Sequence, residues 1–278
     1  AAQDSGATIH CAGVTSSGTV TVGSLDIGHG LGSGGSADTN STAVGMDALD
    51  STESTAVQNT AIGANALTAI STGDYNTAVG KDAGKTVTTG TNNTAVGAAA
   101  LDGATTGAVR NTAIGQAALS GAAVADNTAV GNNALLGFTG SGATVVGSGA
   151  ADALTGASSP SGANTVAIGH NALGVAVNQS DCTAVGAAAL DAATSGNENT
   201  AVGSYALSTT IDGSQNTAVG YGALNADCVA DNTALGKSAL NAYTGSNATA
   251  VGSGAADVAV GNANLTAIGK SALGAATS

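Results

Sequence analysis

The side chains that could take part in catalysis are few, and the sequence keeps them apart. The histidines are His10, His29 and His170, and none has the neighbours expected of a catalytic triad or a metal site. His170 follows a repeated glycine, at a position that other copies fill with residues such as Met46 and Lys81, so we expect it to face solvent. We therefore predict that the protein is not an enzyme and has no catalytic residues, metal or cofactor.

The cysteines are equally scattered. Cys11, Cys182 and Cys228 match no metal-binding spacing, and an odd number argues against a disulfide framework within one chain. We expect small thiols that are buried or partly exposed. A disulfide between symmetry-related copies at Cys11 is the alternative.

Binding residues are not assigned by the sequence either. Gly28-His29-Gly30-Leu31-Gly32 is rich in glycine, but no Walker lysine and no strand–loop–helix unit accompanies it, so a flexible junction is predicted rather than a phosphate site. Tyrosines are suited to stacking on sugars. The four in this chain lie at inequivalent positions of the repeat described below and predict no common binding stripe: Tyr75, Tyr205, Tyr221 and Tyr243.

The composition excludes several classes of partner. Among 278 residues, 43 are glycine and one is proline, aromatic residues make up 2 % and charged residues 8 %, and the net charge is −13. The five Lys and Arg form no cluster, so we expect no nucleic-acid binding. Since no stretch of about twenty apolar residues occurs, we also expect no membrane insertion by a helix. The apolar residues are mostly Ala and Val, which predicts a thin core.

An internal repeat dominates the chain. Its motif is Asn-Thr-Ala-Val-Gly-x-x-Ala-Leu followed by a variable polar loop. From the first central glycine, Gly45, to the last, Gly269, 224 residues cover 13 intervals, or about 17 residues per repeat. The longest interval, 22 residues between Gly147 and Gly169, contains Pro160 and is predicted to hold a lengthened surface loop. The central glycines are Gly45, Gly63, Gly80, Gly97, Gly115, Gly131, Gly147, Gly169, Gly186, Gly203, Gly220, Gly236, Gly252 and Gly269.

These repeats predict an all-β fold, a parallel β-solenoid of about fourteen short coils. Seventeen residues are too few for a helical hairpin, and Thr-Ala-Val/Ile suits a pleated strand. We expect two strands of three to four residues per coil, and a rod roughly 65–70 Å long from strands stacked at ~4.8 Å. Alternation puts Thr and Val on one face of a strand and Ala on the other. We assign Val/Ile and Leu to the interior.

The same reasoning predicts lateral association. Ala stands three residues after the glycine in all fourteen copies, and we place it outside, where small residues allow a close interface between rolls. On this hypothesis Ala118→Leu or Ala189→Leu disrupts a trimer. Asn at the start of most motifs is expected to form a stacked ladder at the turn, because Asn tolerates left-handed backbone and caps turns.

The motif also carries a resemblance. Asn164-Thr165-Val166-Ala167-Ile168-Gly169 is similar to the head repeat of YadA-like trimeric adhesins, and the long arrays resemble repeats of phage tail-fibre proteins. The lead-in at 19–30 resembles the segment before such arrays, so the likeness covers roughly residues 19–278. It implies a left-handed roll and a homotrimer. We divide the chain into an N-terminal cap or junction, residues 1–35, and a solenoid shaft or head, residues 36–278.

The function expected from this resemblance is structural. The chain is predicted to belong to a trimeric fibre of a phage tail or similar appendage, located on the virion or outside the cell. Its partners would be neighbouring fibre subunits and a host receptor, which includes the option of a glycan. Alternatives are the head of a trimeric autotransporter-type adhesin and a subunit of a self-assembling extracellular filament.

Other repeat proteins fit less well. Hexapeptide acyltransferases need three successive hexads per coil, and calcium-binding rolls need Gly-Gly-x-Gly-x-Asp repeats, neither of which the motif supplies. A ladder of Thr hydroxyls could bind ice. Because Thr shares a strand face with Val, however, we expect it to be turned inward, which disfavours that role.

Overall fold

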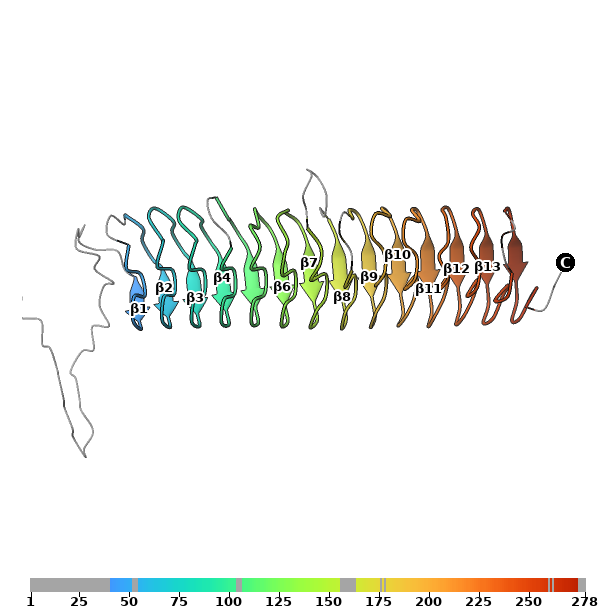
Figure 1. Ribbon diagram of the computed structural model, residues 1–278, viewed down its shortest axis with the longest axis horizontal. Coiled ribbons are helices and arrows are strands. Elements are labelled where there is room, and N and C mark those ends of the chain that lie inside the picture. Colours follow the sequence, from blue (N-terminus) through green and yellow to red (C-terminus); the bar gives the residue numbers. More distant parts are fainter. Residues whose placement is uncertain are drawn as a thin grey trace, which may run out of the picture.

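The structure is a computed structural model, and it describes residues 41–51, 55–103, 107–155, 164–175, 177, 179–259, 261 and 263–274. These residues form a straight rod built on one parallel sheet of fourteen strands in sequence order (Figure 1). Each strand has three residues. The strands are β1 Thr42–Val44, β2 Thr60–Ile62, β3 Thr77–Val79, β4 Thr94–Val96, β5 Thr112–Ile114, β6 Thr128–Val130, β7 Thr144–Val146, β8 Val166–Ile168, β9 Thr183–Val185, β10 Thr200–Val202, β11 Thr217–Val219, β12 Thr233–Leu235, β13 Thr249–Val251 and β14 Thr266–Ile268.

Every strand pairs in register with the equivalent strand of the next coil. In β2 and β3, for example, Thr60 lies opposite Thr77 and Ile62 opposite Val79, and the same correspondence holds along the whole sheet. Each turn of the chain thus places the same residue types at equivalent positions in successive coils. The prediction of an all-β parallel solenoid is confirmed.

The interior is filled mainly by Ala and Leu. The middle residue of a strand is buried in all strands but β1, as are the Ala three residues after the glycine and the Leu that follows it in most described coils. The prediction that Val and Ile fill the interior is wrong: they point outward, and Ile62, Ile114 and Ile168 are each 40 % exposed. The side of each strand that faces the interior carries Ala in all strands but β7, which has Val145 there, while the Val and Ile of the motif lie on the opposite side of the strand.

The proposed interface at Ala is wrong for the same reason. Ala118 and Ala189 have no exposed surface within a single chain. Leu at either position would overpack the interior of the coil rather than an interface between chains. The assignment of Leu to the interior is confirmed, since residues such as Leu119 and Leu190 are fully buried.

Only one strand per coil is formed among the described residues, not two. The second and fourth residues after the central glycine, such as Asn65 and Leu67, have φ near +50 to +60°, which breaks a strand. Hydrogen bonds still link the coils there, because Asn65 N–H donates to the Met46 carbonyl (2.9 Å) and Leu67 N–H to the Ala83 carbonyl (3.0 Å). The segment therefore turns the chain while continuing the axial hydrogen bonding.

The central glycine is required by both backbone angle and space. Gly115 has φ +134°, and a Cβ there would lie 2.3 Å from the carbonyl oxygen of Gly131 in the next coil. Side chains rarely adopt that φ, and the approach of the next backbone leaves no room. This explains why all fourteen copies keep glycine.

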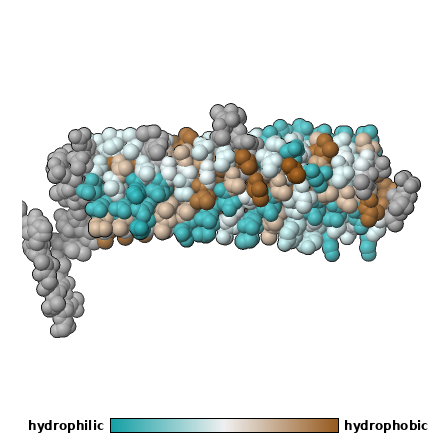
Figure 2. Space-filling view, viewed as in Figure 1, coloured by the Kyte–Doolittle hydropathy of each residue, from teal (hydrophilic) through white to brown (hydrophobic). Residues whose placement is uncertain are grey.

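Several predictions fall on residues outside the described ranges. These are the N-terminal segment 1–35 with its lead-in at 19–30, His10, His29, Cys11 and the Gly28–Gly32 run, and the loop that contains Pro160. The described solenoid lies within the predicted range 36–278. Within the described residues no helix is long and apolar enough to cross a membrane. On the face shown in Figure 2, hydrophilic and hydrophobic residues are interspersed.

Candidate functional site

The outward side of the sheet presents a regular surface. We call it the Thr/Val face and define it as the first and third residues of strands β1–β14. The first residue is Thr in every strand except β8, where it is Val166, and the third is Val or Ile in every strand except β12, where it is Leu235. All of these residues are half-buried or exposed.

The direction of Thr overturns an expectation. Thr does share a face with Val, as alternation requires, but that face is the outer one, so the argument against a solvent-facing Thr ladder is wrong. In-register parallel pairing sets successive Thr and successive Val about 4.8 Å apart along the rod. The described strands contain no charged residue. The face is thus an uncharged, periodic array of hydroxyl and methyl groups.

A buried asparagine ladder runs beside the strands and confirms the structural interpretation of the motif Asn. The Oδ1 atom of each Asn accepts from the next coil: Asn93 N–H donates to Asn76 Oδ1 (3.0 Å), and Asn93 Nδ2 donates to the same oxygen (2.9 Å). Asn93 Nδ2 also donates to the Ala108 carbonyl (2.8 Å). The side-chain polar groups are therefore satisfied inside the rod. The ladder residues, each 3 % exposed or less, are Asn59, Asn76, Asn93, Asn111, Asn127, Asn199, Asn216 and Asn232.

The ladder is interrupted in three successive coils. Ala143, Thr165 and Cys182 take the Asn position there, and the buried hydroxyl of Thr165 has no hydrogen-bond partner among the described residues. Cys182 Sγ lies 3.5 Å from the Gly196 carbonyl, the acceptor equivalent to the one that an Asn amide would use. Burial raises the pKa of the Cys182 thiol to about 11, so this thiol stays protonated.

The other candidate reactive groups are isolated. Cys228 is buried and free, as is Cys182, and burial raises the pKa of the Cys228 thiol as well. This confirms the expectation of buried thiols for these two residues. Within the described ranges no three His, Cys, Asp or Glu side chains lie close enough together to hold a metal ion. His170 is exposed, as predicted.

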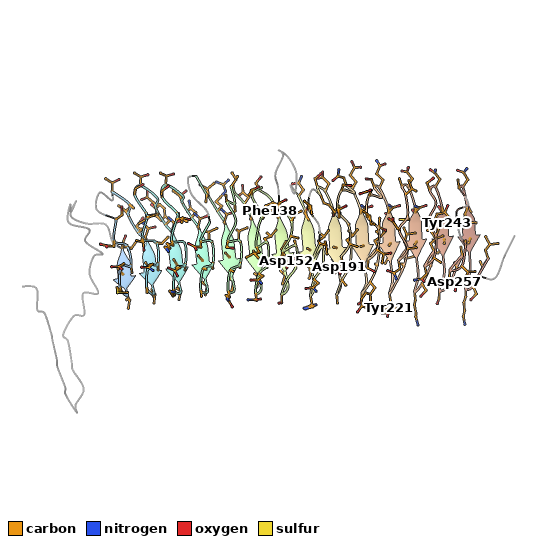
Figure 3. All side chains as sticks on the ribbon, viewed as in Figure 1. Phe138, Asp152, Asp191, Tyr221, Tyr243 and Asp257 are labelled. Carbon is orange, nitrogen blue, oxygen red and sulfur yellow. The ribbon has the colours of Figure 1, made fainter. Side chains whose placement is uncertain are left out.

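The four tyrosines differ in their surroundings. Tyr243 is fully buried, and so is the one phenylalanine, Phe138. Tyr205 and Tyr221 are exposed and in contact, with ring centroids 5.9 Å apart and planes at 77°. Their positions in the repeat differ by one residue, which is why the sequence did not predict the contact. Figure 3 shows Tyr221 at the lower edge of the rod and Phe138 and Tyr243 in its upper half.

An exposed ion pair lies outside the ladder. Arg110 donates to both carboxylate oxygens of Asp126, at 2.6 and 2.8 Å, and joins the same two coils as the Asn111–Asn127 rung. The hydrogen bonds from Arg110 lower the pKa of the Asp126 carboxyl. Because the pair is well exposed, it adds little to stability.

Comparison with known proteins does not assign a family. No protein-family model matches the chain, and no curated protein gave a match.

Proposed function

We propose that this chain is a structural subunit of a homotrimeric fibre, such as a phage tail fibre, that supports attachment to a host surface. The observation that carries the proposal is the Thr/Val face, which extends over all fourteen strands and leaves β-branched side chains exposed. Contiguous exposed apolar surface is typical of an interaction site. Three copies meeting along this face would bury the Val and Ile side chains around a common axis.

Two features of the rod support association along this face. The interior contains mostly Ala and Leu, which contribute little apolar burial against the entropy of ordering about seventeen residues per coil. Charged residues lie outside the strands, so that contact between Thr/Val faces removes no charge from water. The likeness to trimeric adhesin heads and tail-fibre repeats is the basis for proposing three copies per assembly, a left-handed roll and a location on a virion or outside the cell.

The mass of the assembly in solution tests the proposal. Sedimentation of the full chain should give a trimer, and Ile114→Lys should dissociate it, because a charge would enter a dry interface. Val124→Lys is the matched control: Val124 is 51 % exposed but lies outside the strands, so the trimer should persist. A wild-type monomer, or a trimer that tolerates Ile114→Lys, would contradict the proposal.

A second candidate function is favoured by the outward Thr ladder. Hydroxyl and methyl groups repeated every ~4.8 Å on a straight sheet are suited to ordering water into a lattice, so a chain that remained monomeric would present an ice-binding surface. Microscopy of ice crystals grown with the protein separates the two functions. Faceted crystals and arrested growth, lost in Thr94→Lys, would support ice binding, whereas a trimer would hide this face.

A further inference from the structure

We propose that Tyr205 and Tyr221 form a contact site for the pyranose ring of a surface glycan. This proposal rests on the proposed attachment function and names the ligand class and the residues for it. The pair occupies the edge of the rod just after the central glycines Gly203 and Gly220, away from the interior of the coils.

The scarcity of aromatic residues makes the contact informative. The chain has four Tyr, one Phe and no Trp, and two of these five rings are fully buried. Among the three exposed tyrosines, Tyr205 (47 % exposed) and Tyr221 (56 %) touch each other, while Tyr75 (56 %) shows no ring contact with a described residue. Apart from Met46, other coils fill the same positions with small or polar residues, so the coil itself does not require an aromatic ring there.

The backbone of Tyr205 follows the coil. Its φ is +60°, a left-handed conformation that Gly, Asn and Asp adopt readily. The equivalent residues of the other coils have a positive φ whatever their type, as in Asn65, Ala99 and Ala188. The coil therefore sets this backbone angle, and a smaller residue such as Asn or Ala meets its requirements without the aromatic ring.

The surroundings leave space for a sugar and offer polar groups to it. Gly222, the residue equivalent to Tyr205 in the next coil, has no side chain, and a Cβ there would meet Asn241 Nδ2 only at 3.4 Å and Ser238 Oγ at 4.0 Å. Ser238 N–H donates to the Tyr221 carbonyl (2.9 Å), which places Lys237 directly beside Tyr221 on the edge of the rod.

This composition matches what a sugar presents. Aromatic rings pack against the apolar face of a pyranose, and neighbouring polar groups bond its hydroxyls. Lys237 is exposed and belongs to none of the ion pairs between described residues. Its ammonium group favours sugars that carry a carboxylate, such as uronic acids, over neutral sugars.

Binding to immobilised oligosaccharides tests the site. The full chain is applied to a panel of neutral and uronic-acid oligosaccharides, with glycerol-coated surface as the blank. We expect binding to acidic members, weakened about tenfold or more by Tyr221→Ala and by Tyr205→Asn, as for loss of a central aromatic contact. Lys237→Ser should reduce the preference for acidic over neutral sugars.

The control variants separate binding from folding and assembly. Ala and Asn occur naturally at the equivalent positions of other coils, so both variants should fold, and Tyr75→Asn should bind as the wild type does. Absence of binding across the panel, or equal loss in Tyr75→Asn, overturns the site. A change of sedimentation in Tyr205→Asn or Tyr221→Ala would show a contact between chains and overturn it too. Loss of the trimer in Ile114→Lys tests the proposed function separately.

Discussion

Two regions of the rod have the same kind of strand but different interiors: the coils with the asparagine ladder and the three coils in which it is interrupted. From Asn59 to Asn127 each coil has a buried amide that bonds the next coil, whereas Ala143, Thr165 and Cys182 provide none. The strands nonetheless keep their register through the interruption, since β6 to β9 pair residue for residue as elsewhere. Backbone pairing therefore keeps the register where the ladder amides are missing, and we expect the ladder to add stability rather than to choose the register.

The largest expected effect is common to both regions, because both keep the central glycine. Gly115→Ala in the ladder and Gly147→Ala in the interruption each force a Cβ to within 2.3 Å of the next coil's carbonyl oxygen, at a φ above +130°. We expect each to cost about 3 kcal/mol or more of unfolding free energy, measured by chemical denaturation. Gly107→Asn, at an open position with φ +75°, is the control and should cost little. Unequal effects in the two regions would mean that the glycine matters mainly where amides stack.

The next prediction separates the two regions. Asn93→Ala removes the acceptor of Asn111 N–H and the donor to Ala108, both buried, so we expect a loss of about 2–3 kcal/mol. Thr165→Ala deletes a buried hydroxyl without a described partner and should cost less than about 1 kcal/mol. Hydrogen exchange of the flanking amides would localise the difference. Equal losses of unfolding free energy in the two variants would show that the ladder stabilises the rod by packing alone and not by its hydrogen bonds.

Repairing the interruption gives a smaller effect that depends on pH. Cys182→Asn should stabilise the rod by about 1 kcal/mol at pH 7, because its amide reaches the Gly196 carbonyl. The folded pKa of Cys182, about 11, is above its ordinary value of 9.0, so its thiol ionises first in the unfolded chain. The stability that the wild type gains by keeping this thiol neutral is therefore fully present below pH 9 and is lost as the pH rises toward 11. The advantage of Cys182→Asn should widen by roughly 2–3 kcal/mol over that range, and denaturation curves at pH 7, 9 and 11 would reveal a constant gap if this is wrong.

The smallest effect is expected outside the ladder. Arg110→Gln breaks the exposed pair with Asp126 between the same two coils that the Asn111–Asn127 rung joins. Water and salt already screen this pair, so the denaturation midpoint should stay unchanged within error. A clear drop in that midpoint would mean that the exposed Arg110–Asp126 pair contributes to stability as the buried Asn111–Asn127 rung does.

The sequence predicted the repeat, the parallel stacking and the asparagine ladder, since each follows from a residue type recurring at constant spacing. It did not predict which side of each strand faces the interior of the rod. Alternation places Thr112 and Ile114 on one side and Ala113 on the other, but either side can be interior, and side-chain size suggested the wrong one. The burial of the side chains shows which side is interior, because Ala113 has no exposed surface and Ile114 is 40 % exposed. The Tyr205–Tyr221 contact escaped prediction because it joins different repeat positions.

The axial direction of the hydrogen bonds has a mechanical consequence. Backbone and amide bonds between coils point along the rod, so a pull on its ends loads the junctions in series and every junction carries the full force. Under such a load the weakest junction between coils opens first. Between Asn59 and Asn232 the amide side chains are missing only around β7 to β9, which makes this the place where the middle of a stretched rod should open first, while the coils on either side stay folded.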